Sequence, residues 1–382
     1  MTKTPLVTVG IDASNIRAGG GLKHLIEILS NARPADFGVA RVIVWACPSV
    51  SGYFPVSPWL EVVAVSWFEK SIFHRMIWRA TRLKEIMNKS CDVAFFPGGL
   101  SLNLAIPSVV MSQNMQPFMK AERKTEGLSK ARLRVELLRF LQGWSFQKAT
   151  GRIFLTEYVK HEIKKQFCFS ESNTRVIPHG IDQAFFSNKS SDADPEKDGF
   201  RILYVSTLNT YKNQIEVIDA VDALLSKGFD LSITLVGDKV SPYGDKVIEK
   251  IRSINDKYGK EVAVYSGKVA FDELPLIYRS SDIFVFASSC ENLPNILLEA
   301  MAASLPIVCS DVEPMPSVLG NAGLYCDVKN PTSIAEKIEL YIKSSKLRDG
   351  AGKAGNSSSK KYSWRAASDQ TFEFLASIAL GQ

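Results

Sequence analysis

Two glutamates and the segment around them carry the strongest chemical signal in the sequence. Glu291 lies in a loop after an apolar, strand-like run, and Glu299 follows in a helical stretch that runs to about residue 303. Pro294 suits a first helical turn, and Asn295 shares a helix face with Glu299. Free amides at a helix start bind anions, and a carboxylate beside them accepts hydrogen bonds from sugar or ribose hydroxyls. The alternative is an ordinary helix with acidic residues near its positive end.

A lysine stands in a comparable place earlier in the chain. Lys212 follows the strand-like residues 202–206 and comes just before Asn213. Asn213 and Glu216 have the spacing of a capping box, which predicts a helix that starts there and stops at Gly228. The Lys212 ammonium could then reach a diphosphate and stabilise the charge that grows on a leaving nucleoside diphosphate. A solvated loop lysine is the alternative.

The sequence predicts two sets of strands that could form the sheets that position these residues. Its 382 residues suggest roughly two to three domains. Apolar runs rich in β-branched residues alternate with helix-like stretches, which predicts parallel sheets with helices on both faces. The first set lies at residues 6–11, 42–45, 62–65, 93–96, 109–111, 153–155 and 176–177, and the second at 202–206, 231–236, 262–266, 283–287 and 306–309. After the first run, a loop of Gly19, Gly20 and Gly21 leads into a helix over residues 22–30.

A polar, helix-poor segment separates the two sets and predicts a linker. We expect an amino-terminal Rossmann-like domain over residues 1–185, a linker over 186–198 and a second Rossmann-like domain over 199–358. A helix over residues 359–382 is expected to return to the first domain. Because ligands bind at the carboxyl ends of parallel strands, the two sheets should face a cleft between the domains.

Composition excludes several classes of protein. Apolar residues make up 46% and charged residues 23%, as in ordinary globular proteins. No apolar run approaches the roughly 20 residues of a membrane-spanning helix, and no secretory signal is visible, so a cytoplasmic protein is expected. The six cysteines form no CxxC pair and are interpreted as reduced packing residues. Four scattered histidines make a structural zinc site unexpected.

The first half of the chain is basic. Up to residue 185 it has 24 Lys and Arg against 14 Asp and Glu, and beyond it 22 against 26. Arg75, Arg79 and Arg82 fall on one helical stripe, and a second basic stretch over residues 120–148 places Leu133, Leu137, Leu141 and Trp144 at helical spacing. Both could be helices packed on the sheet with a solvated basic face. The functional alternative is contact with an anionic membrane surface, whereas no nucleic-acid motif is present.

Several segments together resemble the family 4 glycosyltransferases. The segment ENLPNILLEA (residues 291–300) is similar to the family's E-x7-E motif, and VIPHGID (176–182) resembles the segment that ends its first domain. YVSTLNTYKN (204–213) resembles G-R-L-x-x-x-K-G. Further similar segments follow in the family's order at residues 235–238, 266–269, 274–288 and 322–325. The likeness covers nearly all of the second domain and the glycine loop of the first.

This resemblance implies a GT-B fold and a retaining transfer that needs no metal or other cofactor. It implies that Glu299 holds the ribose of a nucleotide-sugar and that Glu291 holds the hydroxyls of its sugar. The backbone of Asn292, Leu293, Pro294 and Asn295 would line the sugar and diphosphate, Val269 would meet the base, and Lys212 would bind the diphosphate. Gly20 and Gly21 would allow the first domain's backbone to approach the diphosphate, which a Cβ would obstruct.

The sequence departs from the family pattern at four positions. Thr207 replaces the arginine five residues before Lys212, and Asn292 replaces the glycine after the first glutamate. Gln113 replaces a first-domain histidine; it and Asn114 could bind acceptor hydroxyls but cannot act as a base. A retaining transfer on one face needs no protein base, since the leaving phosphate can take the proton. His179 replaces an asparagine and is interpreted as a hinge residue.

The sequence therefore predicts a hexosyltransferase of the bacterial polysaccharide or O-antigen type. It would move a hexose, first of all mannose from GDP-mannose, to a growing and lipid-linked glycan at the inner face of the cell membrane, to which it binds peripherally. Two alternatives remain. One is a transferase-like module that binds sugar without turnover, and the other is a nucleotide-sugar epimerase on the same fold.

Overall fold

The computed structural model describes residues 6–119, 130–186 and 199–381, and the chain divides into two compact units. Unit 1 is Met1–Gly180 with Tyr362–Gln382, and unit 2 is Ile181–Lys361. The division comes ahead of residue 185 because the short helix η5 (Gln183–Phe186) packs against helices of unit 2. The predicted linker lies outside the described residues, except for Phe186 at the end of η5.

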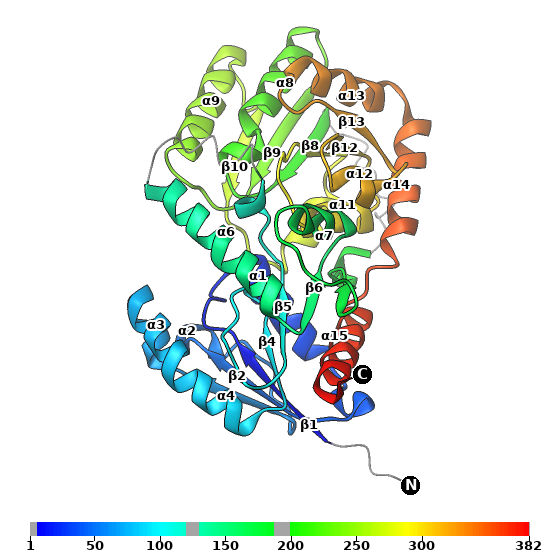
Figure 1. Cartoon of the computed structure of the whole chain (residues 1–382). Helices are drawn as coiled ribbons and strands as arrows, with labels where there is room; N and C mark the ends of the chain where they lie inside the picture. The colour runs from blue at the N-terminus through cyan, green and yellow to red at the C-terminus, as the bar shows by residue number, and fades with distance from the viewer. Residues whose placement is uncertain (1–5, 120–129, 187–198, 382) are drawn as a thin grey trace. The chain divides into compact units, whose positions relative to one another are not determined.

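Unit 1 is built on a parallel sheet in the order β3-β2-β1-β4-β5-β6-β7 (Figure 1). Its central strands are continuous apolar runs because helices cover both faces; VAFF in β4 is buried at every position. The strands are β1 (Val7–Asp12), β2 (Val39–Ala46), β3 (Leu60–Ala64), β4 (Val93–Phe96), β5 (Ser108–Met111), β6 (Gly151–Phe154) and β7 (Thr174–Val176).

Helices from both ends of the chain complete unit 1. The last helix, α15, packs against α1 and contacts β1, β4 and β5. The α-helices are α1 (Gly19–Ser30), α2 (Pro48–Ser51), α3 (Ile72–Trp78), α4 (Lys84–Ser90), α6 (Lys130–Lys148), α7 (Glu157–Lys164) and α15 (Trp364–Leu380). A π-helical turn, η3 (Arg79–Leu83), joins α3 to α4, and short 3-10 turns are η1 (Pro34–Phe37), η2 (Ser66–Phe68) and η4 (Gln116–Phe118).

Unit 2 has a parallel sheet in the order β10-β9-β8-β11-β12-β13. Its strands are β8 (Phe200–Val205), β9 (Leu231–Val236), β10 (Ala263–Gly267), β11 (Ile283–Phe286), β12 (Ile307–Ser310) and β13 (Gly323–Cys326). Its helices are η6 (Thr210–Lys212), α8 (Gln214–Ser226), α9 (Tyr243–Tyr258), α10 (Leu274–Arg279), α11 (Asn295–Ala302), α12 (Met315–Leu319), α13 (Pro331–Lys343) and α14 (Ser345–Ser359).

Each sheet reverses its strand order once, and this fixes where ligands are expected. In unit 1 the reversal lies between β1 and β4, and in unit 2 it lies between β8 and β11. The loops that leave two such strands diverge to opposite sides, so a crevice opens at the carboxyl ends of the strands. The loop after β8 carries Lys212 and the loop after β11 carries Glu291. The two residues predicted to be catalytic therefore meet at the reversal point of unit 2.

Candidate functional site

Lys212 and Glu291 form a buried ion pair at the reversal point of unit 2. The Lys212 ammonium donates to Oε1 of Glu291, and the side chains are only 7% and 15% exposed. The Lys212 Nζ also lies 5.1 Å from the centre of the Tyr211 ring and 5.4 Å from that of Phe286. A solvated loop lysine, the alternative raised from the sequence, is therefore wrong. The ammonium is held in place beside a carboxylate at the edge of the sheet.

The backbone that carries Lys212 is anchored by its neighbour Asn213. Asn213 is fully buried in the left-handed conformation, with φ of 54°, which asparagine tolerates better than most residues. Its amide donates to the carbonyl of Ala287 at 2.6 Å, and its Oδ1 accepts from Lys329 Nζ at 2.6 Å. The predicted capping box is wrong, because the Asn213 side chain is engaged elsewhere and does not cap α8. Asn213 ties Lys212 to the end of β11.

Further hydrogen bonds join the loop after β8 to the loop after β11. The carbonyl of Tyr211 accepts from the backbone N–H of Ser289 at 2.8 Å and from the Ser289 hydroxyl at 3.1 Å. The carbonyl of Lys212 accepts from the hydroxyl of Tyr204, which ties the first loop back to β8. Burial raises the pKa of Tyr204 well above its usual range, and the nearby Glu291 carboxylate raises it further. Tyr204 thus stays a neutral donor, and the two loops keep one arrangement.

Glu299 lies inside α11 beside a tyrosine that the sequence analysis did not single out. Its Oε2 accepts from the Tyr278 hydroxyl at 3.2 Å, and the residue is 7% exposed. Burial, and then Glu299 itself, raises the pKa of Tyr278 well above its usual range, so the phenol remains a donor. Pro294 comes just before the helix rather than in its first turn. Tyr278 fixes the orientation of the carboxylate predicted to bind ribose.

The segment between the two glutamates lies against the body of unit 2. Asn292, Leu293 and Pro294 are buried and Asn295 is half-buried. Oδ1 of Asn295 is enclosed, yet no described residue donates to it. Buried acceptors usually have a donor, so this oxygen, at the first position of α11, suits a ligand that brings one.

Two other residues predicted to bind the donor, Thr207 and Val269, are half-buried. Thr207 is half-buried, and its carbonyl accepts from the Gln214 amide at 3.0 Å. A hydroxyl at this position provides no positive charge. Val269 is half-buried after β10, and β10 is separated from β8 by β9. Val269 therefore lies toward the edge of the sheet, away from Lys212 and Glu291.

In unit 1 the predicted glycine loop is the first turn of a helix. α1 begins at Gly19, with no side-chain cap, so Gly20 and Gly21 present helix-start amides. A Cβ on Gly21 would lie 2.7 Å from Oε1 of Gln113, so the structure brings these two predicted residues together. Oδ1 of Asn114 accepts from the backbone N–H of Gln116 at 3.0 Å, which uses that oxygen in a local turn.

The arginine stripe predicted to face a membrane is not a surface stripe. Arg79 is buried; its Nε donates to Asp12 Oδ2 at 2.6 Å and its Nη2 to the carbonyl of Leu100 at 2.5 Å. Arg75 is half-buried, and burial and then the neighbouring Arg17 and Arg79 lower its pKa. Of the three arginines of the predicted stripe, Arg82 alone is exposed. The π-helical turn at Arg79–Leu83 breaks the helical register that the stripe assumed.

A buried histidine pair in unit 1 was not predicted. His24 and His179 approach at 2.7 Å between their Nδ1 atoms, and the Trp364 ring lies against both. Burial lowers the pKa of His24 to about 3. It also lowers the pKa of His179 well below its usual range, with His24 and Lys23 adding to the effect. Both rings are therefore neutral at physiological pH, and His179 packs in the core of unit 1 just before the division at Gly180.

Three remaining expectations can be set against the described part of the chain. Five of the cysteines are buried, as packing residues should be, but Cys168 is exposed. Among the described residues no group of three or more His, Cys, Asp or Glu could hold a metal ion. None of the described helices is long and apolar enough to cross a membrane.

Part of the chain matches a known protein family. The family described as "Glycosyl transferases group 1" matches residues 185–358. O-antigen chain mannosyltransferase B of Escherichia coli is 28% identical over 169 residues, which is 44% of each chain. The chain spans about half the length of the first curated relatives that it matches.

Solved structures are similar over nearly the whole chain. Sucrose-phosphate synthase from Thermosynechococcus elongatus has a TM-score of 0.75 at 15% identity, covering 96% of this chain and 97% of that one. HepE of Anabaena, in complex with UDP and glucose, has a TM-score of 0.70 at 17% identity, covering 97% of this chain and 100% of that one. At such identities the likeness shows the fold, which is the GT-B arrangement of two parallel sheets.

Proposed function

Because the chain belongs to the group 1 glycosyltransferases, the GT-B family with the E-x7-E motif, we propose that it moves a hexose from a nucleotide-sugar to a lipid-linked glycan. The transfer would retain the anomeric configuration, would not require a metal and would serve cell-surface polysaccharide synthesis. The observation that carries the proposal is the buried Lys212–Glu291 pair where β8 and β11 diverge. A cation and a hydroxyl-binding carboxylate side by side match a sugar joined to a diphosphate.

The chemistry assigned to these residues is a substitution at the anomeric carbon. The bond between that carbon and the phosphate oxygen breaks, and a bond to the acceptor hydroxyl forms on the same face. The leaving phosphate takes the hydroxyl proton, so no protein base is needed. Lys212 would stabilise the growing charge on the diphosphate, while Glu291 would accept hydrogen bonds from the sugar hydroxyls. Because Thr207 adds no positive charge, Lys212 and the backbone amides at the start of α11 would have to stabilise the charge on the diphosphate.

Two observations bear on the donor and give different answers. The similar protein of Escherichia coli is a mannosyltransferase, which favours mannose as the sugar, whereas the Anabaena neighbour is in complex with UDP and glucose. We propose GDP-mannose as the first donor to test. In either case Glu299, oriented by Tyr278, would accept hydrogen bonds from the ribose.

A thermal-shift panel of GDP-, UDP- and ADP-sugars tests the proposal, followed by hydrolysis and transfer assays with and without EDTA. A donor at about 100 times its dissociation constant stabilises the protein by about 2.7 kcal/mol. One nucleotide should give a clear shift, and Glu299→Ala should reduce that shift. If no donor shifts the melting temperature, the replacement of the family's arginine by Thr207 has removed donor binding. The better assignment is then the transferase-like module that binds sugar without turnover. An unchanged shift in Glu299→Ala would instead reject only the ribose assignment.

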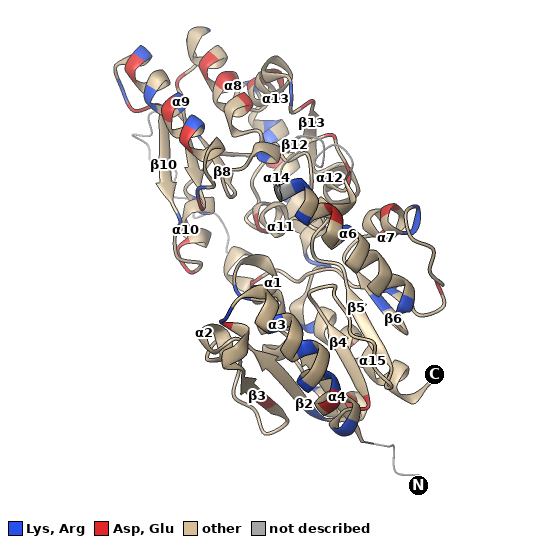
Figure 2. Cartoon of the chain, turned by 60° about the vertical axis from the view of Figure 1, so that its left-hand side comes forward, with Lys and Arg blue, Asp and Glu red and all other residues tan. Residues whose placement is uncertain are grey.

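A lipid-linked acceptor implies work at a membrane surface, and we propose peripheral binding to its inner, anionic face. The excess of basic residues up to residue 185 supports this. Figure 2 shows basic residues on α3, α4 and α6 of unit 1. Since Arg79 is buried and Arg75 half-buried, the contact has to be made by Arg82 and by basic residues outside the predicted stripe.

A further inference from the structure

Helix α6 of unit 1 exposes a continuous apolar stripe. Leu133, Leu137, Phe140 and Trp144 are 73%, 58%, 59% and 41% exposed, and Leu141 beside them is 40% exposed. Their spacing of three, four and seven residues places them on one face of the helix. An amphipathic helix in a globular domain normally turns this face toward the core. Here it faces outward, and a contiguous exposed apolar surface marks a contact with something else.

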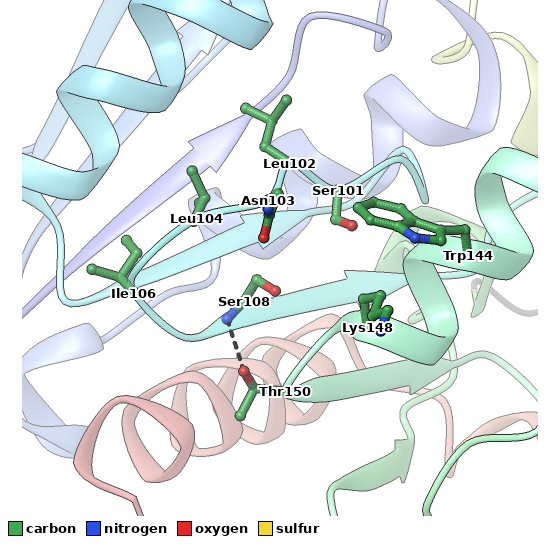
Figure 3. Close-up of a pocket in the computed structure, with 9 residues that line it drawn as sticks. All are labelled: Ser101, Leu102, Asn103, Leu104, Ile106, Ser108, Trp144, Lys148 and Thr150. Carbon is green, nitrogen blue, oxygen red and sulfur yellow. Dashed lines mark hydrogen bonds between the residues drawn. The ribbon is translucent and has the colours of Figure 1, made fainter.

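The stripe ends at a small polar cavity. Trp144 and Lys148 come from the last turns of α6 and both line the cavity, and Figure 3 shows the Trp144 ring beside Ser101. The cavity has a volume of about 80 Å³. None of the nine described residues that line it is Asp or Glu; they are Ser101, Leu102, Asn103, Leu104, Ile106, Ser108, Trp144, Lys148 and Thr150. Hydroxyl, amide, indole and ammonium donors around a space of this kind suit a phosphate group.

The position of the cavity separates it from the sugar-transfer chemistry. Ser108 is the first residue of β5 and Thr150 comes just before β6, so the cavity lies at the amino ends of these strands. Gly21 and Gln113 lie at the opposite, carboxyl-terminal edge of the same sheet. A ligand in the cavity would therefore not be the reacting acceptor.

We propose that α6 and this cavity form a binding site for an anionic phospholipid of the membrane surface. The hydrocarbon part would lie along Leu133, Leu137, Phe140 and Trp144, and the phosphate would enter the cavity beside Lys148. An interfacial helix buries its apolar face at the boundary between head groups and acyl chains, where tryptophan is favoured. This inference rests on the proposed function only in that a lipid-linked acceptor requires a membrane nearby.

Charge favours a membrane over a second copy of this chain. Apart from Glu136, the charged residues of α6 whose side chains are described are all basic, namely Arg132, Arg134, Arg139 and Lys148. In a symmetric dimer the same patch meets itself, so two such helices would bring like charges together, which is costly. Arg139 pairs with Glu136 and binds Gln166, whereas Arg134 and Lys148 are exposed and would be attracted to an anionic lipid surface.

Co-sedimentation with vesicles tests the stripe. Vesicles of mixed phosphatidylcholine and phosphatidylglycerol should bind the protein, and the double variant Leu133→Ser with Leu137→Ser should lower binding about tenfold or more. Leu276→Ser is the matched control, because Leu276 is a 64% exposed leucine of α10 in unit 2. It should bind as the unchanged protein does. Since all three leucines are exposed, melting temperatures should stay the same.

A second variant tests the cavity. Lys148→Gln should weaken binding to the mixed vesicles about fivefold, the effect of one cation at an anionic surface, and should leave binding to pure phosphatidylcholine vesicles unchanged. Millimolar inorganic phosphate should not release the protein from mixed vesicles. Release by phosphate would indicate a site for the free anion and would overturn the lipid assignment.

Two further outcomes would contradict the proposed lipid site. The proposal is wrong if the leucine variants bind mixed vesicles as well as the control does. It is equally wrong if the protein ignores vesicles but self-associates in sedimentation and the leucine variants do not, since a second copy would then cover the stripe. Donor-induced thermal shifts report the proposed function separately, so that function can fail while lipid binding persists, and the reverse.

Discussion

Both units place a buried ion pair at the reversal point of the sheet, yet the two pairs differ in what else they bind. In unit 1, Asp12 at the end of β1 pairs with Arg79, and the side chains are 1% and 9% exposed. Arg79 also binds the carbonyl of Leu100, and Asp12 also accepts from the backbone N–H of Ser14 at 3.0 Å. In unit 2, among the described residues, the Lys212 ammonium donates only to Glu291, although it carries three donors.

This difference separates a structural pair from a functional one. The Asp12–Arg79 pair is tied to the backbone of unit 1, through the carbonyl of Leu100 and the backbone N–H of Ser14. The Lys212–Glu291 pair keeps donors and acceptors for a ligand, and its carboxylate is the more exposed of the two. A buried charge pair alone therefore does not identify a site. The two pairs differ in that Asp12 and Arg79 also bind backbone groups of unit 1, whereas the described contacts of the Lys212 ammonium and the Glu291 carboxylate include no such backbone hydrogen bond.

Removing Arg79 should give the largest loss of stability. Arg79→Met leaves Asp12 charged and enclosed, and losing one partner of a buried pair costs about 3–5 kcal/mol. Denaturant unfolding should show this loss, and hydrogen exchange should place it in β1 and β4. Leu276→Ser provides a surface control. If Arg79→Met lowers the free energy of unfolding by less than about 1 kcal/mol, the Asp12–Arg79 pair is not the structural pair described here.

Removing Lys212 should act mainly on turnover. Lys212→Met should lower kcat by about 100- to 1000-fold, the range seen when one preorganised charge-stabilising donor is lost. Adding Glu291→Gln removes the charge that Lys212→Met leaves behind, so it should recover stability without recovering kcat. A fall in kcat of less than about threefold would show that Lys212, like Arg79, is only structural.

Acid should weaken unit 1 through its buried histidine pair, His24 and His179, because burial lowers the pKa of both rings. Burial lowers the pKa of His24 to about 3 in the folded protein, while the unfolded chain has the ordinary value near 6.5. Between these values the unfolded state binds more protons, so stability is full above about pH 6.5 and falls as the pH drops toward 3. The slope is up to about 1.4 kcal/mol per pH unit for His24. Unfolding at several pH values should show a shallower slope in His24→Gln than in the unchanged protein, and equal slopes would contradict the assignment.

The smallest effect is expected at Lys329, which touches the site only through Asn213. Lys329→Met should lower kcat by roughly threefold to tenfold, the order of one charged hydrogen bond, with little change in KM. Lys329→Arg, which keeps a cationic donor for Oδ1 of Asn213, should retain more of the activity than Lys329→Met. If the two variants lower kcat equally, the hydrogen bond to Asn213 is not how Lys329 acts on the site.

Local patterns predicted the strands well and the surroundings of charged residues poorly. Runs such as residues 283–287 predict buried parallel strands because their side chains are apolar throughout. The β13 strand was missed, since Gly323–Cys326 is short and shows no such run. Arg79 looked like a surface residue because nothing near it in sequence reveals that Asp12 lies beside it.

The candidate site was predictable where its residues belong to one motif. Glu291, Glu299 and Lys212 stand out in the sequence, and the structure adds that Lys212 and Glu291 are in contact. The two supports, Tyr278 and Lys329, lie in other segments and have no local signal, because their roles arise only when the sheet brings them to the site. For the same reason helical spacing placed Leu133 and Leu137 on one face, but could not tell that this face is exposed.

The return of α15 to unit 1 has a consequence for how the protein is made. α15 covers α1 and contacts β1, β4 and β5, and it carries Trp364, which packs on the histidine pair. A ribosome must synthesise all of Ile181–Lys361 before this helix emerges, which takes roughly 10 to 35 s at ordinary rates of translation. Unit 2 can therefore complete its fold first, while the apolar surface of unit 1 that awaits α15 stays open. Nascent chains stalled just before residue 362 should consequently bind chaperones through the first unit, even though it begins at the amino terminus.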